Sequence, residues 1–212
     1  MKVIDTKGIT YLQEFENCRE WYWGTDYACG DLYEAEDVFL AGERFEPNRL
    51  IFAHYPDGRV YEPIQKKELQ YFGDPICIGG VIYFLLAAFD EKMLRVYRLT
   101  LESGKAELEV ELSLGEVKNC YNLKLDGSPL AITRQGEENR FQFIWPKKAE
   151  FAIGERESFL LRQGNKLYFG VWHEDPDYRE EVNVREYPTG RILETIPGTV
   201  KPMPNGEPWI IG

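Results

Sequence analysis

The chain has 212 residues, of which 43% are hydrophobic and 14% aromatic, so it holds enough apolar material for a folded core and is not globally disordered. Lys and Arg total 25 against 36 Asp and Glu, and the formal charge of −11 disfavours attraction to phosphate backbones or anionic lipid. Composition and charge therefore indicate a globular protein with no nucleic-acid and no membrane partner.

The cysteines and the apolar segments indicate the cellular compartment in which the protein is expected. Cys18, Cys29, Cys77 and Cys120 are widely spaced, without a C-x-x-C pair or a histidine at zinc-finger spacing, so we expect free thiols in a reducing environment. The first residues form no apolar signal core, and the longest apolar run, 81–89, is too short to span a bilayer. We expect a cytoplasmic protein with no cofactor and no bound metal.

Short runs of Val, Ile, Leu, Tyr and Phe alternate with Gly, Asp, Asn and Pro, and helical periodicity is nearly absent, so we predict an all-β fold. One sequence pattern recurs. It consists of a strand (A), a turn, a more apolar strand (B), a polar loop, and two further strands (C and D) joined by a short charged turn. Four copies of A, B, C and D follow in chain order, at 38–41, 49–52, 59–64 and 68–72; 76–78, 81–84, 94–101 and 106–112; 123–125, 129–132, 141–145 and 149–153; and 159–161, 166–169, 182–187 and 192–196.

The two ends of the chain supply the remaining strands. Residues 200–203 and 209–211 fit an A–B pair, and residues 1–5 and 9–15 fit a C–D pair. Together they would form a fifth unit that closes the structure by pairing the ends, which protects sheet edges in radial repeats. Dividing 212 by five gives about 42 residues per unit, within the roughly 40–45 typical of propeller blades.

By this blade pattern, and by it alone, the chain resembles five-bladed β-propellers over most of its length. It has no Gly-His…Trp-Asp blade motif, so the functional residues of no particular propeller family can be assigned to it. The resemblance implies a single propeller domain over 1–212, with the fifth blade shared between the termini. A four-bladed propeller, a β-sandwich and a lipocalin-like barrel are the alternative folds.

We expect function on the face where the B–C loops and the D-to-A connections emerge, because strands A and C run opposite to B and D. Both histidines fall on this face, together with an aromatic-rich loop insertion at 16–36. Exposed aromatic rings would stack on a sugar or nucleobase or anchor a protein, but the same loop could plug the channel. The expected ligand-binding residues are Trp21, Trp23, Tyr27, Asp37, His54, Asp74, Arg134, Trp172 and His173.

A metal or catalytic site has weaker support in the sequence. The two histidines lie near aspartates in turn-forming sequences, which favours turn caps over metal ligands, and 174–181 lacks the spacing of a calcium loop. No G-x-S-x-G motif and no phosphate-binding glycine loop is present. The carboxylates ahead of the A strands would line a channel mouth, where propeller glycosidases place paired acids: Glu36, Asp37, Asp74 and Glu157.

We therefore expect a non-enzymatic binding propeller that uses the histidine-bearing face, with 16–36 as lid or contact loop. Its partner would be a protein or a small polar ligand, carbohydrate included. The alternative is a carbohydrate-active hydrolase with channel-mouth carboxylates as acid and base.

Overall fold

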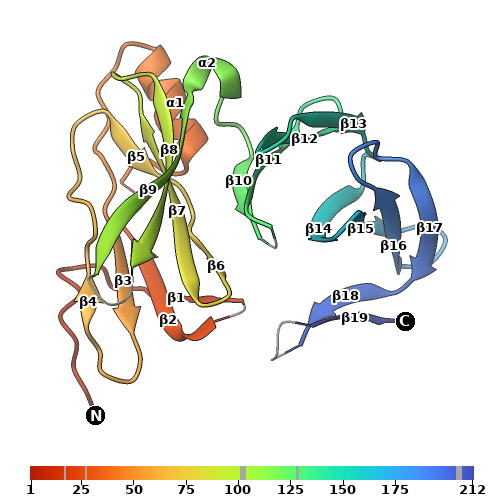
Figure 1. Cartoon of the computed structure of the whole chain (residues 1–212), viewed down its shortest axis with the longest axis horizontal. Coiled ribbons are helices and arrows are strands. Elements are labelled where there is room, and N and C mark those ends of the chain that lie inside the picture. The colour runs from red at the N-terminus through yellow and green to blue at the C-terminus, as the bar shows by residue number, and fades with distance from the viewer. Residues whose placement is uncertain (17, 27, 101–103, 128, 204–206) are drawn as a thin grey trace. The chain divides into compact units, whose positions relative to one another are not determined.

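Strands dominate the structure, a computed structural model that describes residues 1–16, 18–26, 28–100, 104–127, 129–203 and 207–212. Across these residues there are nineteen strands and two short helices, which confirms the predicted all-β class (Figure 1). The chain divides into two units, Met1–Tyr121 and Asn122–Gly212. Each unit has its own packed sheets and its own hydrophobic core.

Two antiparallel sheets form the first unit. The first is a meander of β1 (Gln13–Phe15), β2 (Cys18–Thr25), β3 (Leu50–His54) and β4 (Val60–Tyr61). The second contains β5 (Gln70–Phe72), β6 (Ile76–Ile78), β7 (Val81–Ala88), β8 (Met93–Thr100) and β9 (Lys105–Ser113). Both β5 and β6 pair with β7, so residues 70–72 do not finish the preceding sheet as expected. The N–H of Gly73 donates to Leu85 O (3.1 Å), which carries the pairing along one edge of β7.

Helix α1 (Leu32–Leu40) occupies the place of the strand predicted at 38–41, and that prediction is wrong. The Asp31 carboxylate accepts hydrogen bonds from the N–H groups of Tyr33 (2.8 Å) and Glu34 (2.9 Å), and the Glu34 carboxylate accepts from the Asp31 N–H (2.8 Å). This capping box satisfies donors of the first turn that would otherwise lack partners, and so favours a helix start. The other helix, α2 (Leu114–Val117), is a single turn after β9.

The segment 16–36 is not a loop insertion, because it contains β2, an inner strand of the first sheet. Side chains alternate between the faces of a strand, so Trp21 and Trp23 both point into the core, where they are only 3% and 6% exposed. They belong to the same buried cluster as Phe52 of β3 and Phe84 of β7. The ring centroids of Phe52 and Phe84 are 5.6 Å apart. Trp21 and Trp23, which the sequence suggested were exposed, therefore belong to the buried cluster that joins the two sheets of this unit.

The second unit follows the predicted order of strands. One sheet is a meander of β10 (Leu123–Asp126), β11 (Ala131–Gly136), β12 (Arg140–Trp145) and β13 (Ala149–Ala152). The next is a meander of β14 (Glu157–Gln163), β15 (Lys166–His173), β16 (Arg179–Glu186) and β17 (Ile192–Pro197). A hairpin of β18 (Thr199–Pro202) and β19 (Pro208–Ile211) completes the unit.

Phenylalanine rings fill the core between the two larger sheets of the second unit. The ring centroid of Phe141 in β12 lies 4.7 Å from that of Phe159 in β14 and 5.1 Å from that of Phe169 in β15. Phe151 of β13 reaches the Phe169 ring at 6.0 Å. Such tilted and edge-on pairs add to the stability gained from burying the rings.

The four larger sheets, taken in chain order, resemble the blades of a β-propeller, although the sheet of β5 to β9 is not a simple meander. The fifth blade, expected to be shared between the chain ends, is not confirmed. The strands β18 and β19 pair with each other, and no strand forms within residues 1–12, all of which the structure describes. Residues 13–15, expected in the shared blade, instead begin the first sheet as β1.

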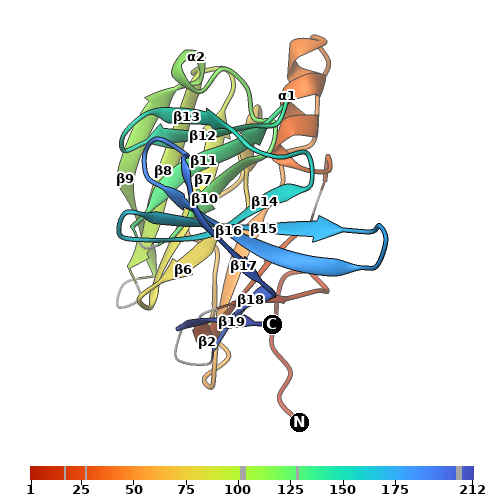
Figure 2. The same cartoon turned by 90° about the vertical axis from the view of Figure 1, so that its right-hand side faces the viewer.

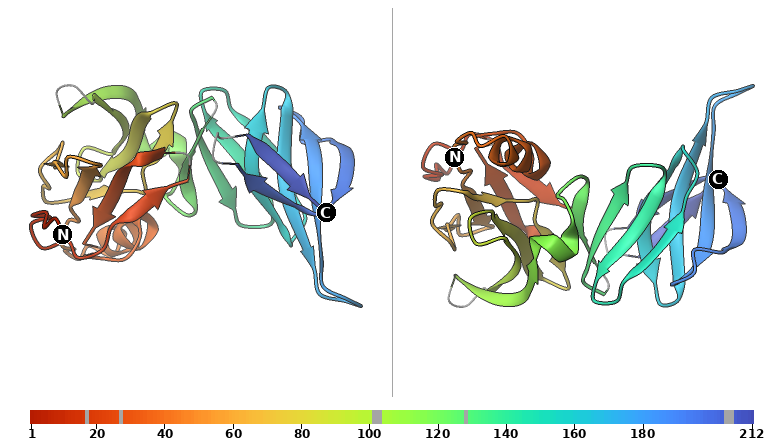
Figure 3. Two further views of the ribbon diagram at one scale, coloured as in Figure 1. Left: turned by 90° about the horizontal axis from the view of Figure 1, so that it is seen from below. Right: turned by 90° about the horizontal axis from the view of Figure 1, so that it is seen from above.

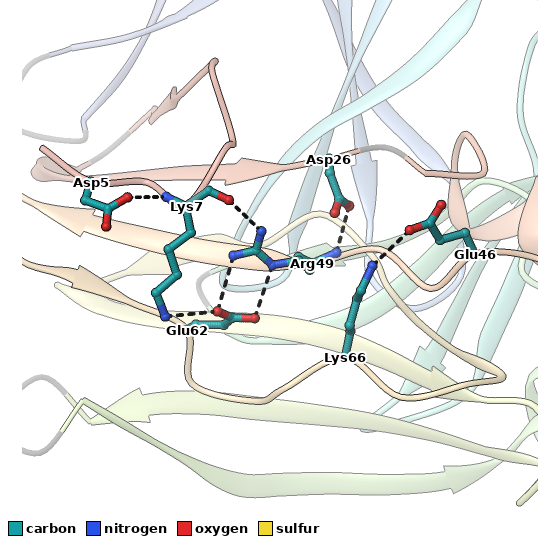
Figure 4. A network of polar contacts seen from close by, with 7 residues as sticks. All are labelled: Asp5, Lys7, Asp26, Glu46, Arg49, Glu62 and Lys66. Carbon is teal, nitrogen blue, oxygen red and sulfur yellow. Dashed lines mark hydrogen bonds and ion pairs between the residues drawn. The ribbon is translucent and has the colours of Figure 1, made fainter.

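Charged side chains tie the N-terminal segment to its own unit (Figure 4). Just before β3, the Arg49 guanidinium donates to Lys7 O (2.9 Å) and forms an ion pair with Glu62 (3.3 Å), while Lys7 Nζ lies 3.5 Å from the same carboxylate. Burial of Glu62 opposes its ionisation, but the hydrogen bonds and charges of Arg49 and Lys7 outweigh it and lower the pKa of Glu62. This network holds the N-terminal segment, residues 1–12, against the first unit without adding a strand.

Candidate functional site

The predicted aromatic contact residues at 21 and 23 are core residues and do not present a binding surface. The buried ring of Trp21 packs against His54 and Tyr61, with centroid distances of 4.7 and 5.6 Å. The structure thus brings Trp21 and His54 together, with Trp21 buried in the core and His54 partly exposed at its edge. Tyr27, a third predicted contact residue, lies outside the described residues.

His54 ends β3 and belongs to a closed turn. Its Nδ1 lies 2.9 Å from Asp57 Oδ1, and its backbone N–H donates to Arg59 O (2.9 Å). The N–H of Arg59 donates to the Asp57 carboxylate (3.1 Å), and this bond, with the contact to His54, lowers the pKa of Asp57. The geometry agrees with the turn-cap interpretation of this histidine.

Two of the four carboxylates proposed for a channel mouth are buried. Glu36 is buried in α1 and accepts a hydrogen bond from the Cys120 N–H (2.7 Å). Glu157 is buried beside Arg185, with Nη2 to Oε2 at 2.6 Å and Nε to Oε1 at 2.7 Å. Asp37 on α1 and Asp74 before β6 are exposed. A buried carboxylate held by a guanidinium or a backbone donor is costly to separate from that partner, so this arrangement adds no support to the hydrolase alternative.

Arg134 is buried in β11, although it was expected on a loop. Its Nε donates to Gln142 Oε1 (3.0 Å), and Gln142 in turn donates to Glu150 (2.8 Å). These residues come from three neighbouring strands of one sheet. Arg134 therefore belongs to a cross-strand ladder that supports the sheet.

The remaining candidates, Trp172 and His173, lie where β15 and β16 run past the strands that flank them. β14 pairs with β15 as far as Glu157 and Val171, and β17 pairs with β16 as far as Pro197 and Glu181. Beyond that level two backbone hydrogen bonds still reach the flanking segments, from Trp172 N–H to Arg156 O (3.4 Å) and from Gly198 N–H to Glu180 O (2.8 Å). Past these bonds β15 and β16 continue as a hairpin that extends from the sheet (Figures 2 and 3). We call residues 172–180 the ribbon.

One face of the ribbon presents aromatic side chains. Trp172 and Glu180 are direct cross-strand partners and so share a face, where Trp172 is 40% exposed and the nearby Tyr178 is 68% exposed. The Tyr178 hydroxyl donates to Glu180 Oε1 (2.6 Å), and this hydrogen bond raises the pKa of Tyr178. Arg156 places its guanidinium carbon 4.8 Å from the centroid of the Trp172 ring.

The opposite face of the ribbon is polar. His173 and Arg179 are direct cross-strand partners there, and both reach Glu181: His173 Nε2 at 3.2 Å and Arg179 Nε at 3.4 Å. The connecting turn adds exposed carboxylates at Glu174, Asp175 and Asp177. The ribbon as a whole has four acidic residues against one arginine.

The comparisons with known proteins assign no family. The sequence matches no protein-family model, and no curated protein is significantly similar to it. The likeness to β-propellers therefore rests on the arrangement of sheets alone.

Two further observations concern metals and membranes. Within the described ranges, no three His, Cys, Asp or Glu side chains gather in a way that would hold a metal ion. Neither described helix has the length and hydropathy needed to cross a bilayer.

Sequence reasoning missed three contributors to the ribbon: Tyr178, Glu180 and Arg156. The string 174–181, which lacks the spacing of a calcium loop, forms an exposed hairpin tip at 174–178. What the sequence could not show is that the flanking strands stop short, because pairing between strands distant in sequence decides where a sheet edge ends. An aromatic residue on each side of an acidic turn, Trp172 and Tyr178, is the signal that was available.

Proposed function

We propose that the protein is a non-enzymatic binding protein whose contact surface is the ribbon at residues 172–180. The observation that carries the proposal is a two-stranded extension with Trp172 and Tyr178 exposed on the same side. An isolated two-stranded hairpin is only marginally stable in water. A hairpin that extends from its sheet with exposed aromatic rings is better suited to contacting a partner than to supporting a core.

Trp172 has the properties of a binding anchor. Large aromatic side chains provide wide contact area with few rotatable bonds, and they dominate the energetics of protein interfaces. Trp172 is already held in place, since its backbone N–H donates to Arg156 O (3.4 Å) and its ring lies against the Arg156 guanidinium. A side chain fixed before binding loses less conformational entropy when the partner arrives.

The charge of the ribbon favours a protein partner with a basic surface. Glu180 lies on the aromatic face, the connecting turn adds the exposed carboxylates of Glu174, Asp175 and Asp177, and the chain as a whole carries a formal charge of −11. Opposite charge on the partner would speed encounter and select against acidic competitors. Lys or Arg side chains could also pack on the exposed rings through cation–π contacts.

The proposal is tested with labelled peptides of equal length, one rich in Lys and Arg, one neutral and one rich in Glu, titrated with the full chain. We expect only the basic peptide to bind, with Trp172→Ala or Tyr178→Ala weakening the affinity about 10-fold, an effect of interface-anchor size. Tyr11→Ala is the matched control, because Tyr11 is a 70% exposed aromatic residue of the other unit. Equal weakening by Tyr11→Ala, or equal binding of all three peptides, would contradict the proposal.

A further inference from the structure

The hairpin of β18 and β19 is a two-stranded sheet of its own within the second unit (Figure 1). In the described part of this unit β19 pairs with β18 alone, so its other edge is open. A two-stranded sheet is only marginally stable by itself in water, and a further strand would stabilise it. The open edge of β19 is therefore suited to strand addition.

The side chains of β19 also favour contact with another strand. Trp209 and Ile211 are 52% and 47% exposed, and they share a face because they are two positions apart. The other edge strands of the second unit each carry at least one charged residue, which discourages edge-to-edge pairing. β19 carries none, so its edge lacks this protection.

The register of the hairpin fixes which backbone groups face the open edge. The Met203 N–H donates to Glu207 O (2.8 Å), and hydrogen-bonded pairs recur at every second position of an antiparallel ladder. Counting from Glu207, Trp209 and Ile211 therefore bond to β18. Ile210 lies between them, so its N–H and C=O both point away from β18, toward the open edge.

We propose that the open edge of β19 binds the same edge of a second copy of the chain, antiparallel, about a two-fold axis beside Ile210. The two Ile210 residues exchange two backbone hydrogen bonds, and the Gly212 N–H of each copy donates to Pro208 O of the other. Pro208 has no N–H, and this register requires none from it. The edge is thus complementary to itself, and two hairpins form one four-stranded sheet.

The same register matches the side chains across the axis. Trp209 of one copy lies opposite Ile211 of the other, in a non-hydrogen-bonded pair, where side chains approach most closely. Pairs of an aromatic and a β-branched residue stabilise antiparallel sheets. Neither of these two positions brings like charges together.

The dimer is expected to be weak and reversible. Pairing of one short edge buries a small interface, and two chains that each carry a formal charge of −11 repel each other. Salt screens this repulsion, so the association should strengthen as the salt concentration rises. A contact held by ion pairs would show the opposite dependence on salt.

Sedimentation equilibrium of the full chain, from about 10 μM to about 1 mM protein at low and high salt, tests the association. We expect the average mass to rise from one chain toward two, and to rise further at high salt. Trp209→Glu should weaken the association about 10-fold, because it removes the ring opposite Ile211 and places a carboxylate there. Leu193→Glu is the matched control, because Leu193 of β17 is 45% exposed and lies outside the proposed pairing. The mass of a single chain at every concentration, or equal weakening by Leu193→Glu, would overturn the proposal.

Cross-linking tests the register. Unlabelled Trp209→Cys is mixed with isotope-labelled Ile211→Cys, the mixture is oxidised mildly, and the linked peptides are mapped by mass spectrometry. We expect disulfides between position 209 of one copy and position 211 of the other, because direct cross-strand partners lie about 4.5 Å apart between Cα atoms, within disulfide reach. Trp209→Cys alone should link far more slowly, because the two copies of position 209 are diagonal neighbours. Links mainly between the two copies of position 209, or none between copies, would contradict the two-fold pairing.

Discussion

At the scale of single residues, exposure separates the tryptophans that build the fold from the one proposed to bind. Trp21 and Trp23 are 3% and 6% exposed, whereas Trp172 is 40% exposed. The sequence shows all three as aromatic residues in polar surroundings. Their environments differ because the strand at 18–25 faces a second sheet, while the end of β15 extends beyond its neighbours.

Replacement of these tryptophans should separate the two roles. We expect Trp21→Ala or Trp23→Ala to lower the free energy of unfolding by about 3–5 kcal/mol, because each leaves a large cavity in the core. Trp172→Ala should cost about 1 kcal/mol, since much of its ring already faces solvent. Urea unfolding followed by circular dichroism measures these differences, and a tolerated Trp21→Ala would revive the idea of an exposed aromatic loop.

Asp126, at the end of β10, provides a test by pH. Burial raises its pKa above the ordinary value of 3.8, although Thr133 donates a hydrogen bond to the carboxylate and partly opposes this. Its contribution to stability is therefore present below pH 3.8 and is lost as the pH rises through the folded-state pKa. Asp126→Asn keeps an oxygen acceptor for Thr133 without the charge. We expect it to be more stable than the wild type at pH 7, with no difference below pH 3.8; unchanged unfolding midpoints at pH 7 would contradict this.

At the scale of elements, sequence patterns predicted most of the strands, and the misassigned elements lie before residue 42. From β6 to β17 the predicted and observed strands overlap, because alternating apolar residues and Gly or Asn turns report a hairpin meander directly. Two segments were misread: residues of β2 were taken for a loop, and the capping box Asp31-x-x-Glu34 was overlooked, so a strand was predicted where α1 lies. Local signals existed in both places, but the choice of sheet for β5 depends on pairing that no local signal encodes.

The ribbon should be separable from the sheet that supports it. Replacing residues 172–180 with Asn-Gly would join Val171 to Glu181 by a short hairpin turn and keep the pairs that flank it. We expect the free energy of unfolding to fall by about 1–2 kcal/mol, because only partly exposed residues are removed. Binding of the basic peptide should be lost at the same time. A variant that unfolds would show that the ribbon is structural, and one that still binds would place the contact elsewhere.

At the scale of the whole molecule, closure by shared termini remains the unconfirmed part of the propeller prediction. Residues 1–12 are held by the Arg49–Glu62–Lys7 network, and the hairpin of β18 and β19 pairs with itself. Each end is therefore attached to its own unit by contacts that the fold shows, and neither depends on strand pairing with the other end.

Truncation after Pro197 tests this attachment. Trp209 and Ile211 of β19 are about half exposed, so loss of the hairpin removes little buried apolar surface. We expect the shortened chain to keep its cooperative unfolding transition, with a midpoint a few degrees lower by calorimetry. Complete unfolding of the shortened chain would favour the five-bladed closure over the arrangement described above.

The most direct test of the central claim, that the partner is contacted by the ribbon, is a titration of the isotope-labelled full chain with the basic peptide, followed residue by residue in NMR spectra. The account predicts that the amide signals of residues 172–180 and the indole N–H of Trp172 shift together and saturate, while the signals of Trp21, Trp23 and His54 stay in place. Shifts centred on residues 18–25 or 54–59, with an unchanged ribbon, would contradict it.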